Sequence, residues 1–231
     1  GESPVVDVRS TNVGVNVTSD HMQNVPNARD VWVVLEEVPA MVMDRYNVGG
    51  SESGQQSSFS AGGGTSQNAY NFDGIDITDM AATGAATYFP YDAFDEVQVS
   101  TSAHKAEVAT PGVFLNIVTR SGSNAFHGLQ AFYWQGPALQ ANNIDDELRE
   151  NGVEEGDEFK RYIDFTLSLG GKIIQDKLWF YGTYQRQQPE IYPIGFTRAD
   201  GTRGVNTTAL KHILVKLDFQ ATPQHKISFS E

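Results

Sequence analysis

The chain contains no cysteine, few basic residues and no long apolar run. Without cysteine it forms no disulfide, an absence that is compatible with several cellular compartments. Its 16 Lys and Arg residues are outnumbered by 29 Asp and Glu residues, which gives a formal charge of −13. A protein that binds DNA or RNA needs a basic face, and no stretch of this sequence provides one. The composition therefore predicts no nucleic-acid partner.

The scarcity of apolar runs argues against a membrane-spanning helix, which needs about 20 apolar residues. The best run covers 31–35 and is stopped by Glu36 and Glu37. A membrane-spanning β-strand needs only about ten residues, half of them polar, so a β-barrel stays possible. Residues 1–3 show no signal peptide, but an exported protein would already have lost one.

What the chain does contain is typical of a globular protein rich in strands. It is 39% hydrophobic and 19% charged, which argues against disorder, and its 231 residues suffice for one large domain or two small ones. Its 22 Gly residues, with many Asn, Thr, Ser and Tyr residues, favour turns and strands over helical bundles.

Two predicted strands, 95–100 and 113–119, organise the chain, and a tight connection of small residues joins them. Before them we expect a compact α/β unit. It begins with an alternating strand or arm over 4–17, followed by a short helix over 19–24 that Thr18 or Ser19 caps.

A second helix is predicted over 28–37, with Asn27 as its N-cap and Pro39 ending it. Its apolar residues recur at helical spacing, which indicates a face packed on a sheet. These residues are Val31, Val34, Leu35 and Val38.

The stretch 47–69 is rich in Gly and Ser. A phosphate-binding loop is one interpretation, but no Gly-Lys-Ser/Thr follows and no helix starts there. A flexible or substrate-facing loop is the interpretation that we favour, because glycine permits backbone conformations closed to other residues.

Three carboxylates, Asp73, Asp76 and Asp79, suggest a metal site. Their spacing does not match a calcium loop, and no glutamate ends the series. Asp73 followed by Gly74 is instead a hairpin-turn signal, so a turn is the favoured interpretation. The aromatic cluster at 88–94 has two interpretations as well, a sugar-binding platform or, more commonly for such clusters, buried packing.

After residue 120 the pattern becomes a series of alternating strands. We expect them at 125–135, 161–170, 178–187 and 209–220, with a last strand containing Ile227 and Phe229. The connections alternate between long and short, as they do in outer-membrane barrels. A soluble β-sandwich also alternates polar and apolar residues, so this pattern alone leaves both architectures open.

Several short motifs follow one another in a specific order, and they include Asn71, Asp73, Gly74, Asn116, Thr119 and Arg120. These six residues resemble the plug motif of TonB-dependent outer-membrane receptors, and the order of the motifs is most similar to that of the Oar-like members. The resemblance continues through Phe126-His127-Gly128 and 169–173 into 176–180. It implies a plug domain over 1–120 and the N-terminal strands of an outer-membrane β-barrel over 121–231. The expected fold class is thus an α+β plug domain followed by antiparallel strands of a transmembrane β-barrel, incomplete in this chain.

The family resemblance implies transport of a substrate across the bacterial outer membrane through a plugged barrel, by import or by export. TonB, bound upstream of this chain, outer-membrane lipid, lipopolysaccharide and an unknown substrate are the expected partners, and neither a cofactor nor a metal is implied. The loops 47–69 and 78–94 are the candidate substrate-facing parts of the plug. Their candidate residues are Glu52, Gln55, Gln56, Tyr88 and Tyr91.

A secreted or surface β-rich adhesin or glycan-binding module is the alternative, with its Tyr and Trp residues as stacking platforms. The acidic loop 136–159 suggests cationic or metal-bound ligands, or simply a solvated loop. The five His residues are scattered and no catalytic motif is visible, so we expect no enzyme. Transporters of this kind close at about 22 strands. Because about five strands cannot close a barrel, we expect the chain to be the middle piece of a longer protein.

Overall fold

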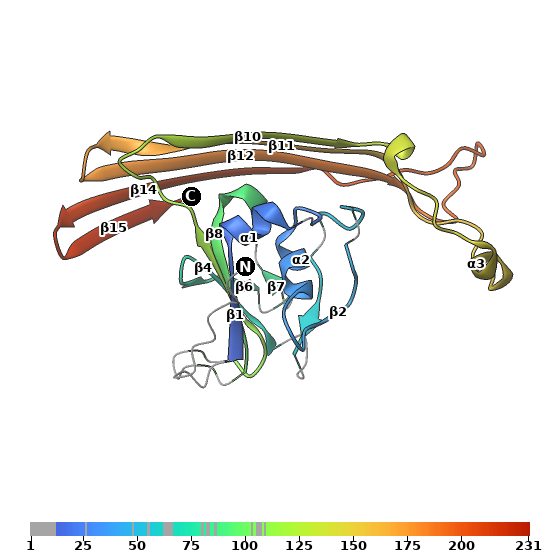
Figure 1. The fold of residues 1–231 in the computed structure, drawn as a ribbon, viewed down its shortest axis with the longest axis horizontal. Helices are drawn as coiled ribbons and strands as arrows, with labels where there is room; N and C mark the ends of the chain where they lie inside the picture. Colours follow the sequence, from blue (N-terminus) through green and yellow to red (C-terminus); the bar gives the residue numbers. More distant parts are fainter. Residues whose placement is uncertain are drawn as a thin grey trace. The chain divides into compact units, whose positions relative to one another are not determined.

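The computed structural model describes residues 13–231 except 26, 48, 55, 62–66, 80, 82–83, 86, 103, 105–107 and 109. The chain divides into two compact units, which are described separately (Figure 1). The first unit comprises Gly1–Tyr46 and Gln56–Thr119, and the second comprises Asn47–Gln55 and Arg120–Glu231. The short segment 47–55 therefore groups with the C-terminal half of the chain rather than with its sequence neighbours.

The first unit is built on a five-stranded sheet in the order β1-β8-β9-β4-β5. Its strands are β1 (Val13–Thr18), β4 (Ala69–Phe72), β5 (Ile75–Asp76), β8 (Phe94–Ser102) and β9 (Phe114–Thr119). Neighbouring strands pair antiparallel, except β4 and β9, which run parallel. The two predicted organising strands thus form the centre of this sheet as β8 and β9.

Shorter elements surround this sheet. Two-residue strands pair as β2 (Val42–Met43) with β3 (Phe59–Ser60), and as β6 (Thr78–Asp79) with β7 (Gly84–Ala85). A single 3-10 turn, η2 (Tyr91–Ala93), leads into β8.

Two short helices lie at the start of the first unit. Helix α1 (Ser19–Asn24) matches the predicted span, and its N-cap is Thr18, whose hydroxyl accepts a hydrogen bond from the His21 backbone N–H. Helix α2 (Val31–Glu36) begins three residues later than predicted, and its N-cap is Asp30.

The later start of α2 has a local cause. Asn27 was predicted to cap the helix, but its Oδ1 accepts from the Arg29 backbone N–H at 2.8 Å and its Nδ2 donates to the Met22 carbonyl at 2.9 Å. Arg29 itself has a φ of 57°, a left-handed conformation that cannot continue a helix. Asn27 therefore closes a turn, and the helix starts after it.

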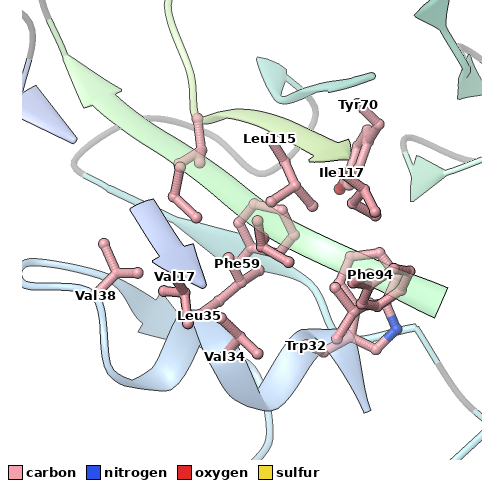
Figure 2. Packing of buried hydrophobic residues seen from close by; sticks show 14 of the residues in the cluster. Val17, Trp32, Val34, Leu35, Val38, Phe59, Tyr70, Phe94, Leu115 and Ile117 are labelled. Carbon is pink, nitrogen blue, oxygen red and sulfur yellow. The ribbon is translucent and has the colours of Figure 1, made fainter. Parts of the chain in front are cut away.

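The core of the first unit lies between α2 and the sheet, and Figure 2 shows its packing. Helix residues Trp32, Val34 and Leu35 are buried against strand residues that include Leu115 and Ile117. Trp32, Phe59 and Tyr70 form a set of ring contacts with centroids 5.7–6.1 Å apart. The helix face that packs here is the one predicted from the spacing of apolar residues in the sequence.

The second unit contains a six-stranded antiparallel sheet in the order β10-β11-β12-β14-β15, with β13 beside β12. Its strands are β10 (His127–Gln135), β11 (Glu158–Ile174), β12 (Leu178–Tyr192), β13 (Asn206–Thr207), β14 (Leu210–Thr222) and β15 (His225–Ser230). Figure 1 draws β10, β11, β12 and β14 as long strands lying side by side. Within the described residues this sheet ends at β10 and β15 and does not close.

The connections of this sheet differ in length. β11 and β12 are joined by the three residues 175–177, and β14 and β15 by Pro223 and Gln224. The connection from β10 to β11 is long and carries the 3-10 turn η3 (Pro137–Leu139) and helix α3 (Asp146–Glu150). The sequence predicted this alternation, although β11 and β12 extend further into the long connections than expected.

At the short-turn end, Asn124 joins two turns. Its Oδ1 accepts from the Asp176 backbone N–H at 2.9 Å and from the Trp179 indole N–H at 2.8 Å, and its Nδ2 donates to the Asp176 carboxylate. Asp176 has a φ of 58°, so the hydrogen bonds of Asn124 hold a turn residue in an uncommon backbone conformation.

The two faces of the second sheet have opposite polarity. Side chains of one face are apolar and exposed: Phe132, Trp134, Leu167, Leu169, Ile213, Val215, Leu217, Phe219, Ile227 and Phe229. Side chains of the other face are polar and buried: Asp164, Thr166, Ser168, Thr183, Gln185, Gln187, Lys216 and Asp218. A soluble sheet buries its apolar face, so this polarity is the reverse of the usual arrangement.

Hydrogen bonds within the second sheet satisfy several of its buried polar groups. The Gln185 amide donates to both carboxylate oxygens of Asp164, at 3.0 and 3.2 Å, and the Gln187 amide donates to the Tyr162 hydroxyl oxygen at 2.9 Å. The Ser228 hydroxyl donates to Asp218 at 2.6 Å. Such pairing offsets the desolvation of polar groups that would otherwise make this face unstable.

No helix among the described residues has the length and apolarity that crossing a membrane requires. The predicted fold class, an α+β unit followed by antiparallel strands of an incomplete barrel, is confirmed by the topology of the two sheets. The assignment of 1–120 and 121–231 as two receptor domains stays a prediction.

Candidate functional site

The residues of the predicted plug motif meet where the β4–β5 turn lies against the end of β9. Asp73 accepts a hydrogen bond from the Thr119 backbone N–H at 2.8 Å and another from the Thr119 hydroxyl at 2.6 Å. The Gly74 backbone N–H donates to the Asn116 Oδ1 at 3.1 Å. Two motif segments more than 40 positions apart in the chain are thereby fastened to each other. We call Asp73, Gly74, Asn116 and Thr119 the clamp.

The clamp explains why its residue types are needed. Asp73 is a non-glycine residue with a φ of 49°, a conformation that Asp tolerates better than most residues. Gly74, with a φ of 82°, completes the turn. Asn71, the remaining member of the motif on β4, donates only a long hydrogen bond of 3.4 Å to the Gly74 carbonyl. Arg120 follows β9 directly and groups with the second unit.

A row of polar side chains extends from the clamp across the sheet. The Asn116 Nδ2 donates to the Gln98 Oε1 at 2.9 Å, and the Gln98 amide donates to Glu96. The Asn16 Nδ2 donates to the same Glu96 carboxylate at 2.7 Å. The row thus connects β1, β8 and β9 through side chains, and the Gly74 backbone N–H joins it to the β4–β5 turn.

The opposite face of the same strands is apolar and packs in the core. Val97 and Val99 of β8 alternate with Glu96 and Gln98, and Leu115 and Ile117 of β9 lie on either side of Asn116; all four apolar residues are at most 3% exposed. Because strand residues alternate between faces, the position of each residue in the pattern decides its partner. The sheet therefore combines one buried apolar face with one hydrogen-bonded polar face.

The predicted substrate-facing residues differ in their contacts and in the unit to which they belong. Glu52 is half-buried, and its backbone N–H donates to the Asn47 Oδ1 at 3.0 Å. Gln56 pairs with Ala85 through both ends of its amide, at 2.8 and 3.0 Å, so its side chain is used to hold a loop. Gln55 lies outside the described residues. Glu52 and Gln56 fall in different units.

The two tyrosine candidates have different surroundings. Tyr88 is 40% exposed, as a substrate-facing residue must be. Tyr91 is only 4% exposed, and its hydroxyl donates to the Met22 carbonyl at 3.2 Å. The prediction that Tyr91 faces a substrate is therefore corrected, because its ring packs against Phe94 in the core. Packing of aromatic residues was the alternative interpretation for this cluster. It also describes Phe89, whose ring stacks on the Phe72 ring with 4.9 Å between the ring centres.

A nearly buried ion pair next to Tyr91 escaped the sequence analysis. The Arg29 guanidinium pairs with the Asp92 carboxylate, and it also lies 5.6 Å from the centre of the Tyr91 ring. Burial raises the pKa of the Tyr91 hydroxyl, and the nearby Arg29 charge only partly opposes that effect. Arg29 and Asp92 are 63 positions apart, and neither belongs to a pattern that signals pairing.

Residues 49–54 of the glycine-rich segment form a turn held by polar groups of the same segment. The Asn47 side chain accepts from Glu52 and donates to the Ser53 hydroxyl at 3.2 Å. Gly50 and Gly54 have φ values of 96° and 89°. A Cβ on Gly50 would be 2.9 Å from the Tyr162 ring of β11, and one on Gly54 would be 2.5 Å from Thr208, which lies between β13 and β14. Among the described residues, no group of three or more His, Cys, Asp or Glu side chains could hold a metal ion.

Comparison with known proteins identifies related sequences. A family profile described as an outer membrane beta barrel domain matches residues 118–196. The chain is 30% identical over 219 residues to the TonB-dependent transporter Oar of Myxococcus xanthus, a match that covers 89% of this chain and 19% of that protein. The chain therefore spans about a fifth of the length of this curated relative.

Solved structures show the same fold at lower identity. The outer membrane transporter YddB from Escherichia coli superposes with a TM-score of 0.69 at 18% identity, covering 91% of this chain and 31% of that one. The siderophore receptor PirA from Acinetobacter baumannii superposes with a TM-score of 0.67 at 20% identity, covering 96% and 32%. In both cases the chain corresponds to about a third of the solved protein.

The clamp predicts a specific energetic coupling. Asp73→Ala in the full-length protein should lower the free energy of opening of β9 by about 1–3 kcal/mol, because the Thr119 N–H and hydroxyl lose their acceptors. Hydrogen exchange of the peptide covering 110–120 measures this change. Asp95→Ala, at an exposed carboxylate on β8, is the control and should leave the exchange nearly unchanged. If the effects of Thr119→Val and Asp73→Ala on the free energy of opening simply add in the double variant, the two residues are not coupled and the clamp is contradicted.

Tyr91 predicts a loss of stability in alkali. Its folded-state pKa lies above the unfolded value near 10, so its contribution is complete below pH 10 and is lost as the pH rises toward the folded pKa. The urea midpoint of the first unit, followed by Trp32 fluorescence with Trp134 and Trp179 changed to Phe, should fall above pH 10. Tyr91→Phe should flatten that fall, whereas Tyr46→Phe, at a residue 66% exposed, should not. Equal pH profiles for the two variants would contradict this assignment.

Proposed function

We propose that this chain, which is homologous to TonB-dependent transporters of the bacterial outer membrane, forms the plug and the first wall strands of a barrel that moves a substrate across that membrane. The first unit is the plug in this proposal and the second sheet is part of the wall. The homology covers a fifth of the relative's length, so the activity of the whole protein is inferred from a part of it.

The observation that carries the proposal is the reversed polarity of the second sheet. Its exposed face is a band of Leu, Ile, Val and aromatic side chains, which only lipid solvates favourably. On β11 this band extends from Ile163 to Ile173, ten residues apart, close to the length of a membrane-spanning strand. The same exposed band argues against the soluble adhesin or glycan-binding alternative, since such a patch in water promotes aggregation.

The polar face of the wall suits a lumen. Asp164, Gln185 and Gln187 on this face are hydrogen-bonded rather than packed by apolar contacts. Replacing such polar contacts by water costs less free energy than exposing an apolar core, because water offers the same hydrogen bonds.

Within the first unit, the clamp and its polar row are proposed to keep the plug folded while the rest of the unit is remodelled. Tyr88 and Glu52 remain the candidate substrate-facing residues, since both are at least partly accessible. Gln56 is a weaker candidate, because its amide is engaged with Ala85. TonB is the proposed energy-coupling partner and lipopolysaccharide the proposed lipid neighbour. No enzymatic activity is proposed.

Removal of the plug tests this function directly. The full-length protein in a planar bilayer should conduct no ions, whereas the same protein lacking 13–119 should form an open, ohmic channel. A control lacking 141–156, in the long β10–β11 connection, should stay closed. A plug-deleted protein that folds as a barrel, shown by heat-modifiable electrophoretic mobility, yet conducts no more than the full-length protein would overturn the proposal.

A further inference from the structure

A cavity of about 650 Å³ lies at the long-loop end of the second sheet. Its lining comes from β11, β12, β13 and the loop before β13: Lys160, Tyr192, Arg198, Thr202, Arg203, Val205 and Thr207. Three of these residues are cationic, three carry hydroxyls and none is acidic. In a chain with a formal charge of −13, this concentration of positive charge points to an anionic ligand.

Local contacts hold two of the three cations in position. Arg203 pairs with Glu158 and stacks over the Tyr192 ring at 4.4 Å, and Lys160 pairs with Glu190 at 3.0 Å. The loop carrying Arg198 is closed by a hydrogen bond of 2.8 Å from its backbone N–H to the Thr202 carbonyl. Among the described residues, no carboxylate pairs with the Arg198 guanidinium. Arg198 therefore brings an uncompensated charge to a largely preformed cavity.

The strand register places this cavity on the lipid-facing side of the sheet. On β12, Tyr192 shares its face with Glu190 and Tyr184, because the side-chain period of a strand is two. Glu190 lies opposite Arg161 and Thr207, and Tyr184 lies opposite Leu167 and Ile213, which belong to the exposed apolar band. The cavity and the apolar band are thus parts of one face.

The cavity also lies at the height where a lipid headgroup is expected. The apolar residues of β11 end at Ile163, and the next residue on that face is Arg161, followed by Lys160. Trp134 lies opposite Ile163, in the position of an interfacial aromatic residue. Two further exposed cations, Arg186 and Lys211, lie opposite each other, and Arg186 also lies opposite Phe165 of β11.

From this placement we propose that the cavity binds the phosphate groups of a phosphorylated glycolipid in the outer leaflet, the chemistry of lipopolysaccharide. Arg198 and Arg203 supply guanidinium forks suited to phosphate oxygens, Lys160 supplies a point charge, and the Thr202 and Thr207 hydroxyls add donors. The apolar band continues below the cavity and receives the acyl chains. The inference rests on the proposed membrane location of the sheet, but not on transport.

Lipid binding to the detergent-purified, delipidated full-length protein tests this site. The probes are diphosphorylated lipid A, the same lipid with both phosphates removed, and inorganic phosphate. We expect the diphosphorylated lipid to bind most tightly and Arg198→Glu to weaken its binding at least tenfold. Arg198→Lys should weaken binding less than threefold. Arg149→Glu is the matched control, since it makes the same charge change in α3 and should change binding less than twofold.

Three results would overturn the site. Arg198→Glu could bind the diphosphorylated lipid as tightly as the wild type does. The dephosphorylated lipid could bind equally well, which would mean that the acyl chains alone are recognised. Inorganic phosphate could compete as effectively as the lipid, which would assign the cavity to a free anion. Heat-modifiable mobility of each variant checks the barrel fold, and conductance of the plug-deleted protein tests the transport proposal separately.

Discussion

The alternation of side chains along β11, β12 and β14 is the constraint on which the rest of the second unit depends. Asp164, Thr166 and Ser168 point to one face, and Phe165, Leu167 and Leu169 point to the other. A slip of one residue in register would exchange these faces and place carboxylates in lipid. The buried pair of Gln185 and Asp164, which are diagonal neighbours on β12 and β11, helps to specify the register, because a slip of one residue would separate the two side chains. The same alignment sets Arg161 and Lys160 at the end of the apolar band.

The first unit uses the same alternation of side chains for a different purpose. Its sheet needs an apolar face for α2, and it uses the remaining face for hydrogen bonds. Asp73 ties the β4–β5 turn to β9, and the polar row continues that connection through Gln98 and Glu96 to the edge strand β1. Because these bonds are partly accessible to water, they specify the arrangement more than they stabilise it. In the proposed function, this arrangement suits a plug that moves without unfolding completely.

Much of this architecture is accessible from sequence because it depends on local patterns. The period of two located every long strand, Asp73 and Gly74 identified the turn, and the order of short motifs indicated the family. Features set by tertiary contacts were missed. The start of α2 depends on the left-handed conformation of Arg29, and the pair of Arg29 with Asp92 joins segments that share no pattern. Tyr91 was misassigned because an aromatic residue gives the same signal on a surface and in a core. The cationic cavity was also missed, since its residues come from three strands and a loop.

The most direct test of the account places a spin label on each face of the wall. The chain has no cysteine, so Ile213→Cys and Thr183→Cys in the reconstituted full-length protein each give a single labelling site within these residues. The label at position 213 should collide frequently with oxygen dissolved in the lipid and rarely with a water-soluble nickel chelate. The label at position 183 should show little contact with lipid-dissolved oxygen. A label at position 213 that the nickel chelate reaches freely would mean that the apolar face meets water, and it would contradict the assignment of this sheet to a membrane wall.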